Sequence, residues 1–275
     1  MKASSHLPTL ITSFALSVLF GGLAGCQDNS ENNTIEQNSP PAHVPAEQLK
    51  CKVLEEMTRP YRGFTQGLFI DAGKLYESTG GYGTSLVRRI DLKSQKIEVS
   101  KDLPNQYFGE GLAPFGDNKM IQLTWKSGQA LVLDRENINV EKVFRYQTEG
   151  WGIATQKERM VMSDGSSKLT FMDPENFHPL KKISITKNGK PVELLNELEW
   201  VGDHIYANVW MTDEIVKIDS ETGKVVASID CRGLLKKTLS SDAVLNGIAY
   251  DHSTQTFYIT GKLWPKIFKV EFIKA

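Results

Sequence analysis

Short runs in which hydrophobic and polar side chains alternate recur from about residue 64 onwards, separated by turn residues. Alternation with a period of two is typical of β-strands that bury one face. Five runs begin with similar tripeptides, which are Gln66-Gly67-Leu68, Glu110-Gly111-Leu112, Trp151-Gly152-Ile153, Asn196-Glu197-Leu198 and Asn246-Gly247-Ile248. Their first residues are spaced by 44, 41, 45 and 50 positions, and no amphipathic helical stretch competes strongly. The pattern therefore predicts an all-β protein built from a repeat.

Each repeat continues with a turn, a second strand-like run and a third run that ends in Asp or Glu, as in "KLYEST" and "LVRRID". A fourth run is visible in most repeats, and four strands in about 40 to 50 residues are typical of a β-propeller blade. The last repeat has only 29 residues after Asn246, enough for three strands, so Lys50–Met57 is expected to supply the fourth. We predict a five-bladed β-propeller whose ring is closed by an N-terminal strand that joins the last blade.

The repeat sorts the polar residues between two faces of such a ring. The start of the first strand and the end of the second lie on the same face, because these two strands run antiparallel. This face collects Phe64, Gln66, Phe108, Glu110, Trp125, Trp151, Asp164, Asn196, Trp210, Asn246 and Lys262. Aromatic side chains around a few convergent polar groups are typical of a small-ligand pocket.

The remaining residues of these types have a structural interpretation. The opposite face collects Asp91, Asp134, Asp173 and Asp219. We interpret these aspartates, and mainly Asp164 as well, as turn residues that hydrogen-bond their own backbone. Trp200 and Trp264 are interpreted mainly as core residues.

The N-terminal segment has the pattern of a bacterial lipoprotein signal. Lys2 precedes an apolar run, and "LAGC" places Cys26 directly after small residues. We predict a signal peptide over residues 1–26, with Cys26 lipidated. The alternatives are an ordinary signal peptide or a membrane helix, although the run is short for a spanning helix. Residues 27–48 are polar and predict a disordered tether, followed by the propeller domain over residues 49–275.

This organisation predicts a monomer in the bacterial cell envelope, attached to the membrane by its lipid alone and working at the periplasmic face. Gln27 is not an acidic retention signal, which favours the outer membrane. An oxidising compartment permits a disulfide between Cys51 and Cys231, which the closed ring would place on neighbouring outer strands. Two separate buried thiols are the alternative.

Charge and spacing argue against several classes of function. The net charge is −1 and Lys and Arg form no run, which gives no reason to expect nucleic acid as a partner. The five histidines have no spacing with cysteine that suits zinc, and no Ser-His-Asp arrangement is evident. A structural calcium ion held on the propeller axis by backbone oxygens stays open.

Ten segments between about Cys51 and Phe272 resemble, in order, the plant- and bacterial-type glutaminyl-peptide cyclotransferase family. They are "FTQGL", "YESTGGYGTSLVR", "YFGEGL", "QLTWKSG", "GWGIATQ", "SDGSSKLTFMDP", "LNELEWV", "IYANVW", "VLNGIAYD" and "FYITGKLWPK". The resemblance implies a five-bladed propeller and an aminoacyltransferase that needs no zinc or other cofactor. Its reaction would convert N-terminal glutaminyl residues of peptides or proteins to pyroglutamyl residues with release of ammonia.

The resemblance also implies roles for individual residues. Glu110 matches the carboxylate that acts as general base and then general acid. Lys262 and Asn196 match residues assigned to polarising or holding the substrate carboxamide. The matching substrate-binding positions are Gln66, Phe64, Phe108, Trp125, Trp151 and Trp210.

Two other functions fit the predicted fold. A lactonase-like propeller hydrolase would gather several acidic and Asn ligands around a metal, whereas this mouth offers one clear Glu and a Lys. A non-catalytic propeller that binds peptides is the other alternative, because a fold alone does not define a function. The sequence does not specify the natural substrate beyond its first residue.

Overall fold

The computed structural model describes residues 44–61, 63–235 and 240–275. The predicted signal peptide, Cys26 and all but the end of the predicted tether lie outside these ranges. Within them the chain forms 22 β-strands and no helix, which confirms the predicted all-β class. Among the described residues there is consequently no helix with the length and apolar character to cross a membrane.

Three separate four-stranded antiparallel sheets follow one another along the chain. The first contains β2 (Thr65–Asp71), β3 (Lys74–Thr79), β4 (Leu86–Asp91) and β5 (Ile97–Asp102). The second contains β6 (Gly109–Phe115), β7 (Lys119–Thr124), β8 (Gln129–Asp134) and β9 (Val140–Arg145). The third contains β10 (Ile153–Gln156), β11 (Arg159–Ser163), β12 (Lys168–Met172) and β13 (Pro179–Ser184). The second and third strands coincide with the strand-like runs of the sequence repeat.

An eight-stranded sheet and a small hairpin complete the domain. The eight-stranded sheet has the order β16-β17-β18-β19-β1-β22-β21-β20. Its strands are β1 (Glu47–Thr58), β16 (Leu195–Val201), β17 (His204–Val209), β18 (Glu214–Asp219), β19 (Val225–Asp230), β20 (Leu245–Asp251), β21 (Thr256–Gly261) and β22 (Lys266–Lys274). The hairpin is β14 (Thr186–Lys187) with β15 (Lys190–Pro191). The large sheet therefore consists of two further groups of four strands, β16–β19 and β20–β22 with β1.

The N-terminal strand joins the two groups of the large sheet. β1 pairs antiparallel with β22, so both ends of the chain contribute to one group as predicted, and it pairs parallel with β19 of the other group. The parallel pairing begins with Glu47 against Ala227. β1 therefore starts at Glu47, two residues before residue 49, where the propeller domain was predicted to start.

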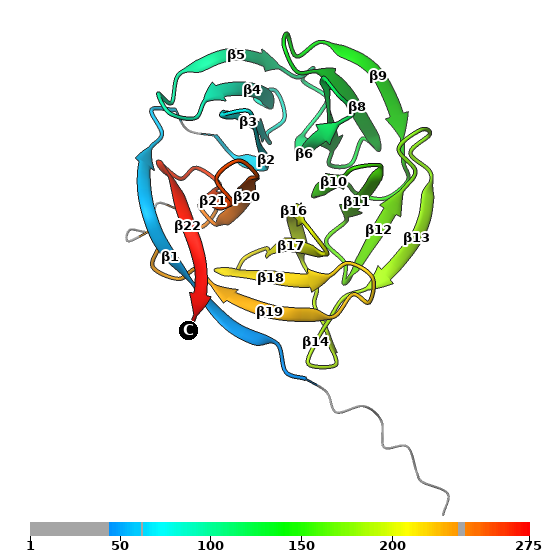
Figure 1. Cartoon of the computed structure of the whole chain (residues 1–275). Coiled ribbons are helices and arrows are strands. Elements are labelled where there is room, and N and C mark those ends of the chain that lie inside the picture. The colour runs from blue at the N-terminus through cyan, green and yellow to red at the C-terminus, as the bar shows by residue number, and fades with distance from the viewer. Residues whose placement is uncertain (1–43, 62, 236–239) are drawn as a thin grey trace, which may run out of the picture. The chain divides into compact units, whose positions relative to one another are not determined.

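The innermost strands form a closed circuit around the centre of the domain (Figure 1). β2, β6, β10, β16 and β20 each contact the next strand in this order, and β20 contacts β2. The close approach of these strands requires glycine. A Cβ on Gly67 would lie 2.2 Å from the backbone nitrogen of Leu112, and a Cβ on Gly152 would lie 2.0 Å from the carbonyl oxygen of Asn196. The shared Gly of the sequence repeat thus permits close approach between neighbouring sheets.

The fourth repeat has Glu197 where the others have Gly. This carboxylate is buried, and its oxygens accept the backbone N–H of Leu68 at 3.3 Å and of Ile248 at 2.8 Å. Since Leu68 lies in β2 and Ile248 in β20, Glu197 links three innermost strands. The fourth repeat therefore has Glu in place of Gly because the carboxylate at this position accepts hydrogen bonds from two other innermost strands.

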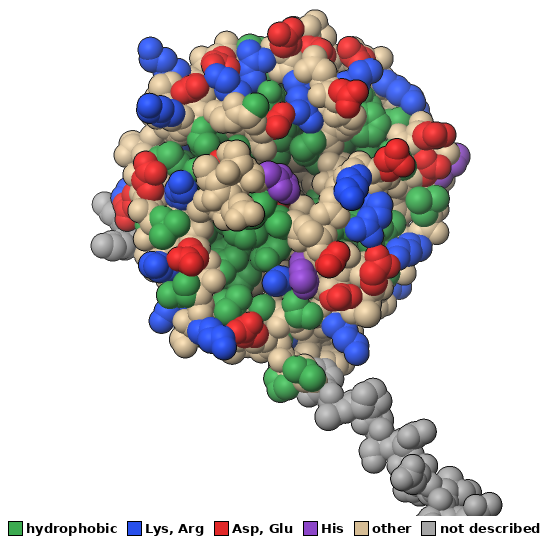
Figure 2. Space-filling view, viewed as in Figure 1, with side chains coloured by type: hydrophobic (Ala, Val, Ile, Leu, Met, Phe, Trp, Pro, Cys, Tyr) green, Lys and Arg blue, Asp and Glu red, His purple; other side chains and the backbone are tan. Residues whose placement is uncertain are grey.

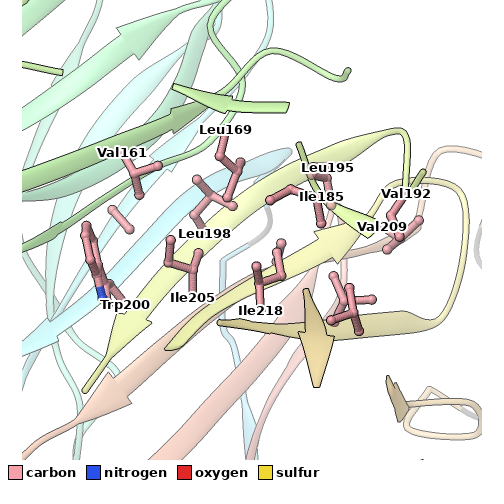
Figure 3. Close-up of a cluster of buried hydrophobic side chains, with 14 of the residues drawn as sticks. Val161, Leu169, Ile185, Val192, Leu195, Leu198, Trp200, Ile205, Val209 and Ile218 are labelled. Atoms are coloured by element: carbon pink, nitrogen blue, oxygen red, sulfur yellow. The ribbon is translucent and has the colours of Figure 1, made fainter. Parts of the chain in front are cut away.

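Hydrophobic side chains fill the space between neighbouring sheets. Figure 3 shows one such cluster, in which Val161 and Leu169 of the third sheet lie near Leu198, Trp200 and Ile205 of the large sheet. Trp200 and Trp264 are both buried, as expected for core residues. This packing holds the innermost strands, and therefore the residues at their starts, in fixed relative positions.

The turns away from the pocket contain the predicted aspartates. Asp91, Asp134, Asp173 and Asp219 each accept a hydrogen bond from a backbone N–H two or three residues later. Their structural interpretation is confirmed, and Asp164 forms the same kind of turn with the N–H of Ser166. In Figure 2, charged side chains of both signs are interspersed around the face shown, and hydrophobic side chains lie toward its middle.

Candidate active site

One pocket of about 260 Å³ is lined by the nine residues that the sequence assigned to a catalytic or substrate-binding role. They are Phe64, Gln66, Phe108, Glu110, Trp125, Trp151, Asn196, Trp210 and Lys262. They come from the starts of first strands and the ends of second strands in all five groups. A larger groove of about 920 Å³ lies along the Pro114–Lys119 and Thr155–Met160 segments, but none of the nine residues lines it.

β-Bulges direct several of these side chains into the pocket. The pairing register shifts between Thr65 and Gly67, between Gly109 and Leu112, and between Leu195 and Leu198. The bulged segments therefore contain Gln66, Glu110 and Asn196. A bulge leaves a residue out of the regular ladder and changes the direction of its side chain. This local irregularity explains how a Glu is accommodated in an otherwise apolar innermost strand.

Glu110 is the only carboxylate among the nine and is 5% exposed. Gln66 Nε2 donates to its Oε1 at 3.2 Å, and the Ser78 hydroxyl donates to its backbone carbonyl. Burial raises the pKa of the Glu110 carboxyl well above its usual value, the positive charge of Lys262 opposes the rise, and the negative charge of Glu149 adds to it. A buried carboxyl with a raised pKa is suited to proton transfer near neutral pH.

Asn246, which the repeat placed on this face without a catalytic or substrate-binding role, fixes the amide orientation of Gln66. Its Nδ2 donates to the carbonyl oxygen of Thr65 at 2.9 Å and to Gln66 Oε1 at 3.4 Å. With Oε1 occupied as an acceptor, Gln66 presents Nε2 to Glu110. Asn246 begins the fifth repeat at the position that Gln66 and Glu110 occupy in theirs, and this equivalence is the sequence signal that identifies it.

Lys262 provides the cation of the pocket and is 4% exposed. Its Nζ lies 4.7 Å from the centre of the Phe64 ring and 5.8 Å from that of Trp210. Burial lowers the pKa of Lys262 to about 8, while the negative charges of Glu110 and Asp242 oppose the change. Lys262 is therefore mostly protonated at neutral pH and able to donate hydrogen bonds.

Asn196 contributes an unused acceptor. The residue is 2% exposed, and its Oδ1 is buried without a hydrogen-bond partner within the described part of the chain. A buried acceptor without a partner costs about 1–3 kcal/mol. Because the residue lines the pocket, a bound molecule with an N–H group can satisfy this oxygen.

The pocket wall consists of interlocking aromatic rings. Phe108 contacts Phe64 and Trp125 edge to face, with ring centres 6.3 Å and 5.4 Å away, and Trp151 contacts Trp210 in the same way at 5.4 Å. Edge-to-face pairs contribute about 0.5–1.5 kcal/mol beyond the area they bury. These rings shape a compact space and limit water around Glu110.

Glu149 contacts two rings of the pocket wall and was missed by sequence reasoning. Its Oε2 accepts the indole N–H of Trp125 at 2.7 Å and of Trp151 at 3.0 Å. Partial burial raises the pKa of Glu149, but the hydrogen bonds from Trp151 and Trp125 and the charge of Lys126 outweigh it and hold the pKa below its usual value. Glu149 lies in a loop outside the repeat alignment, so no periodic signal identifies it.

The two cysteines of the domain lie in contact. Cys51 of β1 and Cys231, directly after β19, are free thiols whose sulfur atoms are 2.8 Å apart. The parallel pairing of β1 with β19 brings them together. The disulfide stays a prediction that this proximity supports.

Within the described ranges no three His, Cys, Asp or Glu side chains converge as metal ligands. A calcium site built from backbone oxygens is a different type of site, which does not depend on such side chains.

The pocket places a buried acid and a buried cation within an aromatic wall, on a closed circuit of β-sheets. These features define an all-β protein whose pocket resembles an enzyme site for a small polar group. Residues 23–272 match the model of the glutamine cyclotransferase family. The chain is 38% identical over 232 residues to the Arabidopsis thaliana glutaminyl-peptide cyclotransferase, covering 82% of this chain and 72% of that protein. It therefore belongs to the glutamine cyclotransferase family.

A solved structure is similar as well. The crystal structure of Myxococcus xanthus glutaminyl cyclase superposes with a TM-score of 0.78 and 35% sequence identity. The match covers 84% of this chain and 99% of the Myxococcus chain. The likeness therefore extends over the whole of that relative.

Proposed function

We propose that the protein is a glutaminyl-peptide cyclotransferase, an aminoacyltransferase that converts N-terminal glutaminyl residues of peptides or proteins to pyroglutamyl residues with release of ammonia. Family membership and the two named relatives support this activity. The observation that carries the proposal is the position of Glu110, a single buried carboxylate with a raised pKa in the same aromatic pocket as Lys262.

We further infer that the five groups of strands are the blades of a five-bladed β-propeller. The closed circuit of innermost strands and the pairing of β1 with β22 support this reading. In such a ring the pocket lies at the central mouth, where every blade contributes the start of its first strand. This placement accounts for a site assembled from residues as distant in sequence as Phe64 and Lys262.

The reaction forms one bond and breaks another at the same carbon atom. The α-nitrogen of the substrate attacks the Cδ of its own carboxamide and forms the ring bond. The bond from Cδ to the carboxamide nitrogen then breaks, and this nitrogen leaves as ammonia. One proton moves from the attacking nitrogen to the leaving nitrogen, so the balance requires no co-reactant.

Glu110 is assigned to both proton transfers. Gln66 occupies Oε1, so Oε2 is the oxygen that takes the proton from the attacking amine and returns it to the leaving nitrogen. General acid–base catalysis is most effective when the pKa of the group lies near the working pH, which the raised pKa of Glu110 favours. One side chain can act as base and then as acid because the attacking and the leaving nitrogen are both bonded to Cδ after the attack.

Lys262 and Asn196 are assigned to the substrate carboxamide. The Lys262 ammonium stabilises the negative charge that develops on the carboxamide oxygen during attack. Asn196 Oδ1, which has no partner among the described residues, accepts an N–H of the carboxamide and orients the leaving nitrogen. The aromatic wall favours a compact conformer in which the amine lies close to Cδ, which lowers the entropic part of the barrier.

The pocket chemistry also bears on the hydrolase alternative. A divalent cation in a lactonase-like site requires several oxygen ligands. The nine pocket residues supply one carboxylate, which lies within the electrostatic reach of Lys262. This donor set favours acid–base chemistry on a carboxamide.

We place the protein in the bacterial cell envelope as a monomer, attached by a lipid on Cys26 and facing the periplasm, with the outer membrane favoured. The signal pattern of residues 1–26 and the polar tether support this placement. The lipid would hold the domain near the membrane while its pocket stays accessible to peptides.

An ammonia assay with two substrates tests the activity. We expect the purified protein to release ammonia from a Gln-initiated dipeptide in the presence of a metal chelator, and not from the N-acetylated dipeptide, whose nitrogen is blocked. Absence of ammonia above the uncatalysed rate would refute the proposed activity. Ammonia from the acetylated peptide would indicate hydrolysis of the carboxamide instead of cyclisation.

A further inference from the structure

Glu149 connects two walls of the pocket without lining it. Trp125 follows β7 of the second sheet, and Trp151 precedes β10 of the third sheet. Both indole N–H groups donate to the same carboxylate oxygen, Oε2 of Glu149, at 2.7 Å and 3.0 Å. Hydrogen bonds to an ionised acceptor are stronger than those between neutral groups. One side chain thereby fixes the edges of two rings that come from different sheets.

Neighbouring contacts hold the faces of the same rings. Lys126 Nζ lies 4.1 Å from the centre of the Trp125 ring and 3.6 Å from Glu149 Oε1. On the other ring, Trp151 packs closely on Gly165, where a Cβ would lie 2.7 Å from the indole. These contacts restrict how far each ring can shift, whereas the hydrogen bonds to Glu149 determine which edge of each ring points away from the pocket.

We propose that Glu149 is a positioning residue, which orients Trp125 and Trp151 so that the pocket fits the glutaminyl side chain. This inference rests on the proposed function. Glu149 does not touch the reacting atoms and acts through the two indoles. Its loss should therefore weaken substrate binding more than it slows the chemical step, because Glu110, Lys262 and Asn196 make no hydrogen bond to it. Its negative charge is the smallest of the three influences on the Glu110 pKa, so the effect of its removal on proton transfer should be minor.

Indole NMR combined with kinetics tests this role. The protein has five tryptophans, so ¹⁵N-labelled Trp gives five indole N–H signals, which single Trp→Phe variants assign. In Glu149→Ala we expect the signals of Trp125 and Trp151 to move upfield and the signals of Trp200 and Trp264 to stay. The latter two indoles donate to backbone carbonyls of Gly202 and Ala243.

The kinetic expectation is a rise in KM for a Gln-initiated dipeptide of about tenfold or more, as for loss of a hydrogen bond to a charged group, with a smaller change in kcat. Glu149→Gln keeps an acceptor of the same length, so both signals and KM should move less. Glu158→Gln is the matched control, because Glu158 is exposed in the turn at the other end of the β10–β11 hairpin. Glu158→Gln should change neither the indole signals nor KM.

The outcomes separate the contact from its functional consequence. Unchanged signals of Trp125 and Trp151 in Glu149→Ala would overturn the contact, and shifted signals with an unchanged KM would overturn its role in binding. If Glu149→Ala does not fold, Glu149→Leu, which also removes the acceptor shared by both indoles, takes its place: unchanged Trp125 and Trp151 signals or an unchanged KM in that variant would refute the proposal. A wild-type protein without ammonia release would refute the proposed function, while the indole signals would still report whether Glu149 orients the rings.

Discussion

Substitution of Gly111 by Ala is expected to separate the innermost strands β6, which contains Glu110, and β10, which Trp151 precedes by two residues. The Gly111 N–H donates to the carbonyl oxygen of Trp151 at 2.7 Å. A Cβ on Gly111 would lie 2.7 Å from that oxygen and from the backbone nitrogen of Ile153. Ordinary contacts of a Cβ begin near 3.4 Å, so the strands must move apart by several tenths of an ångström.

The magnitude follows from which atoms must move. Overpacking of an interior costs about 1–3 kcal/mol, and the upper part of this range applies because backbone atoms, which cannot change rotamer, block the Cβ. The lower conformational entropy of an unfolded chain with Ala offsets about 0.4–1 kcal/mol. We therefore expect a net loss of about 2 kcal/mol, or a Tm lower by roughly 4–8 °C for a domain of this size.

Activity should fall as well, because Glu110 is the residue before the substitution. A displacement of about 1 Å in a catalytic group can cost about 100-fold in rate, so a smaller shift should lower kcat by about tenfold. Thermal unfolding followed by circular dichroism and ammonia release from a Gln-initiated dipeptide measure the two effects.

Gly116→Ala in the turn at the far end of the same hairpin is the matched control. Gly116 has a φ of 62° and a Cβ there would meet no atom within 4 Å, so the substitution costs only backbone strain of about 1 kcal/mol. It should leave kcat unchanged. A Gly111→Ala variant with the Tm and kcat of the wild type would refute the close-approach argument.

Two further predictions concern Lys262 and the cysteine pair. Lys262→Met should lower kcat/KM about 10²–10³-fold, as for removal of a donor to a developing oxyanion. The ratio of wild-type to variant kcat/KM should fall as pH rises through about 8, because Lys262 loses its proton there. Titration of the substrate amine affects both proteins equally and cancels in this ratio. A ratio independent of pH would contradict the role of Lys262 as a cation. Peptide mapping of protein purified without reductant should find Cys51 linked to Cys231, and Cys231→Ser should destabilise the protein by about 2–4 kcal/mol. Two unlinked thiols in the purified protein would show that the sulfur contact does not become a bond.

The sequence predicted the innermost residues of the site because the repeat placed them at equivalent positions. Gln66, Glu110 and Asn196 begin the same strand in three repeats, and the antiparallel direction of the second strand adds Trp125 and Lys262. This sorting needs only strand periodicity and a closed ring. The composition of the turn separated Asp164 from the site residues, and the family resemblance then assigned roles to the residues that line the pocket.

Contacts that depend on loop conformation were not predictable in the same way. Glu149 precedes Trp151 by two residues, and its carboxylate reaches Trp125 only because the loop between the second and third sheets returns to the pocket. The parallel pairing of β1 with β19 likewise begins with Glu47 and Gln48 at the end of the predicted tether and continues through Leu49 and Lys50. Neither feature has a periodic pattern, since both depend on how separate groups of four strands approach each other.

The most direct test of the central claim is the turnover of Glu110→Gln on a Gln-initiated dipeptide. The substitution keeps the side-chain volume and the acceptor for Gln66 Nε2, but it removes the group that accepts and returns the proton. We expect kcat to fall about 10²–10⁴-fold with an intact fold by circular dichroism, whereas Glu158→Gln should keep wild-type activity. A folded Glu110→Gln variant that releases ammonia at nearly the wild-type rate would contradict the account.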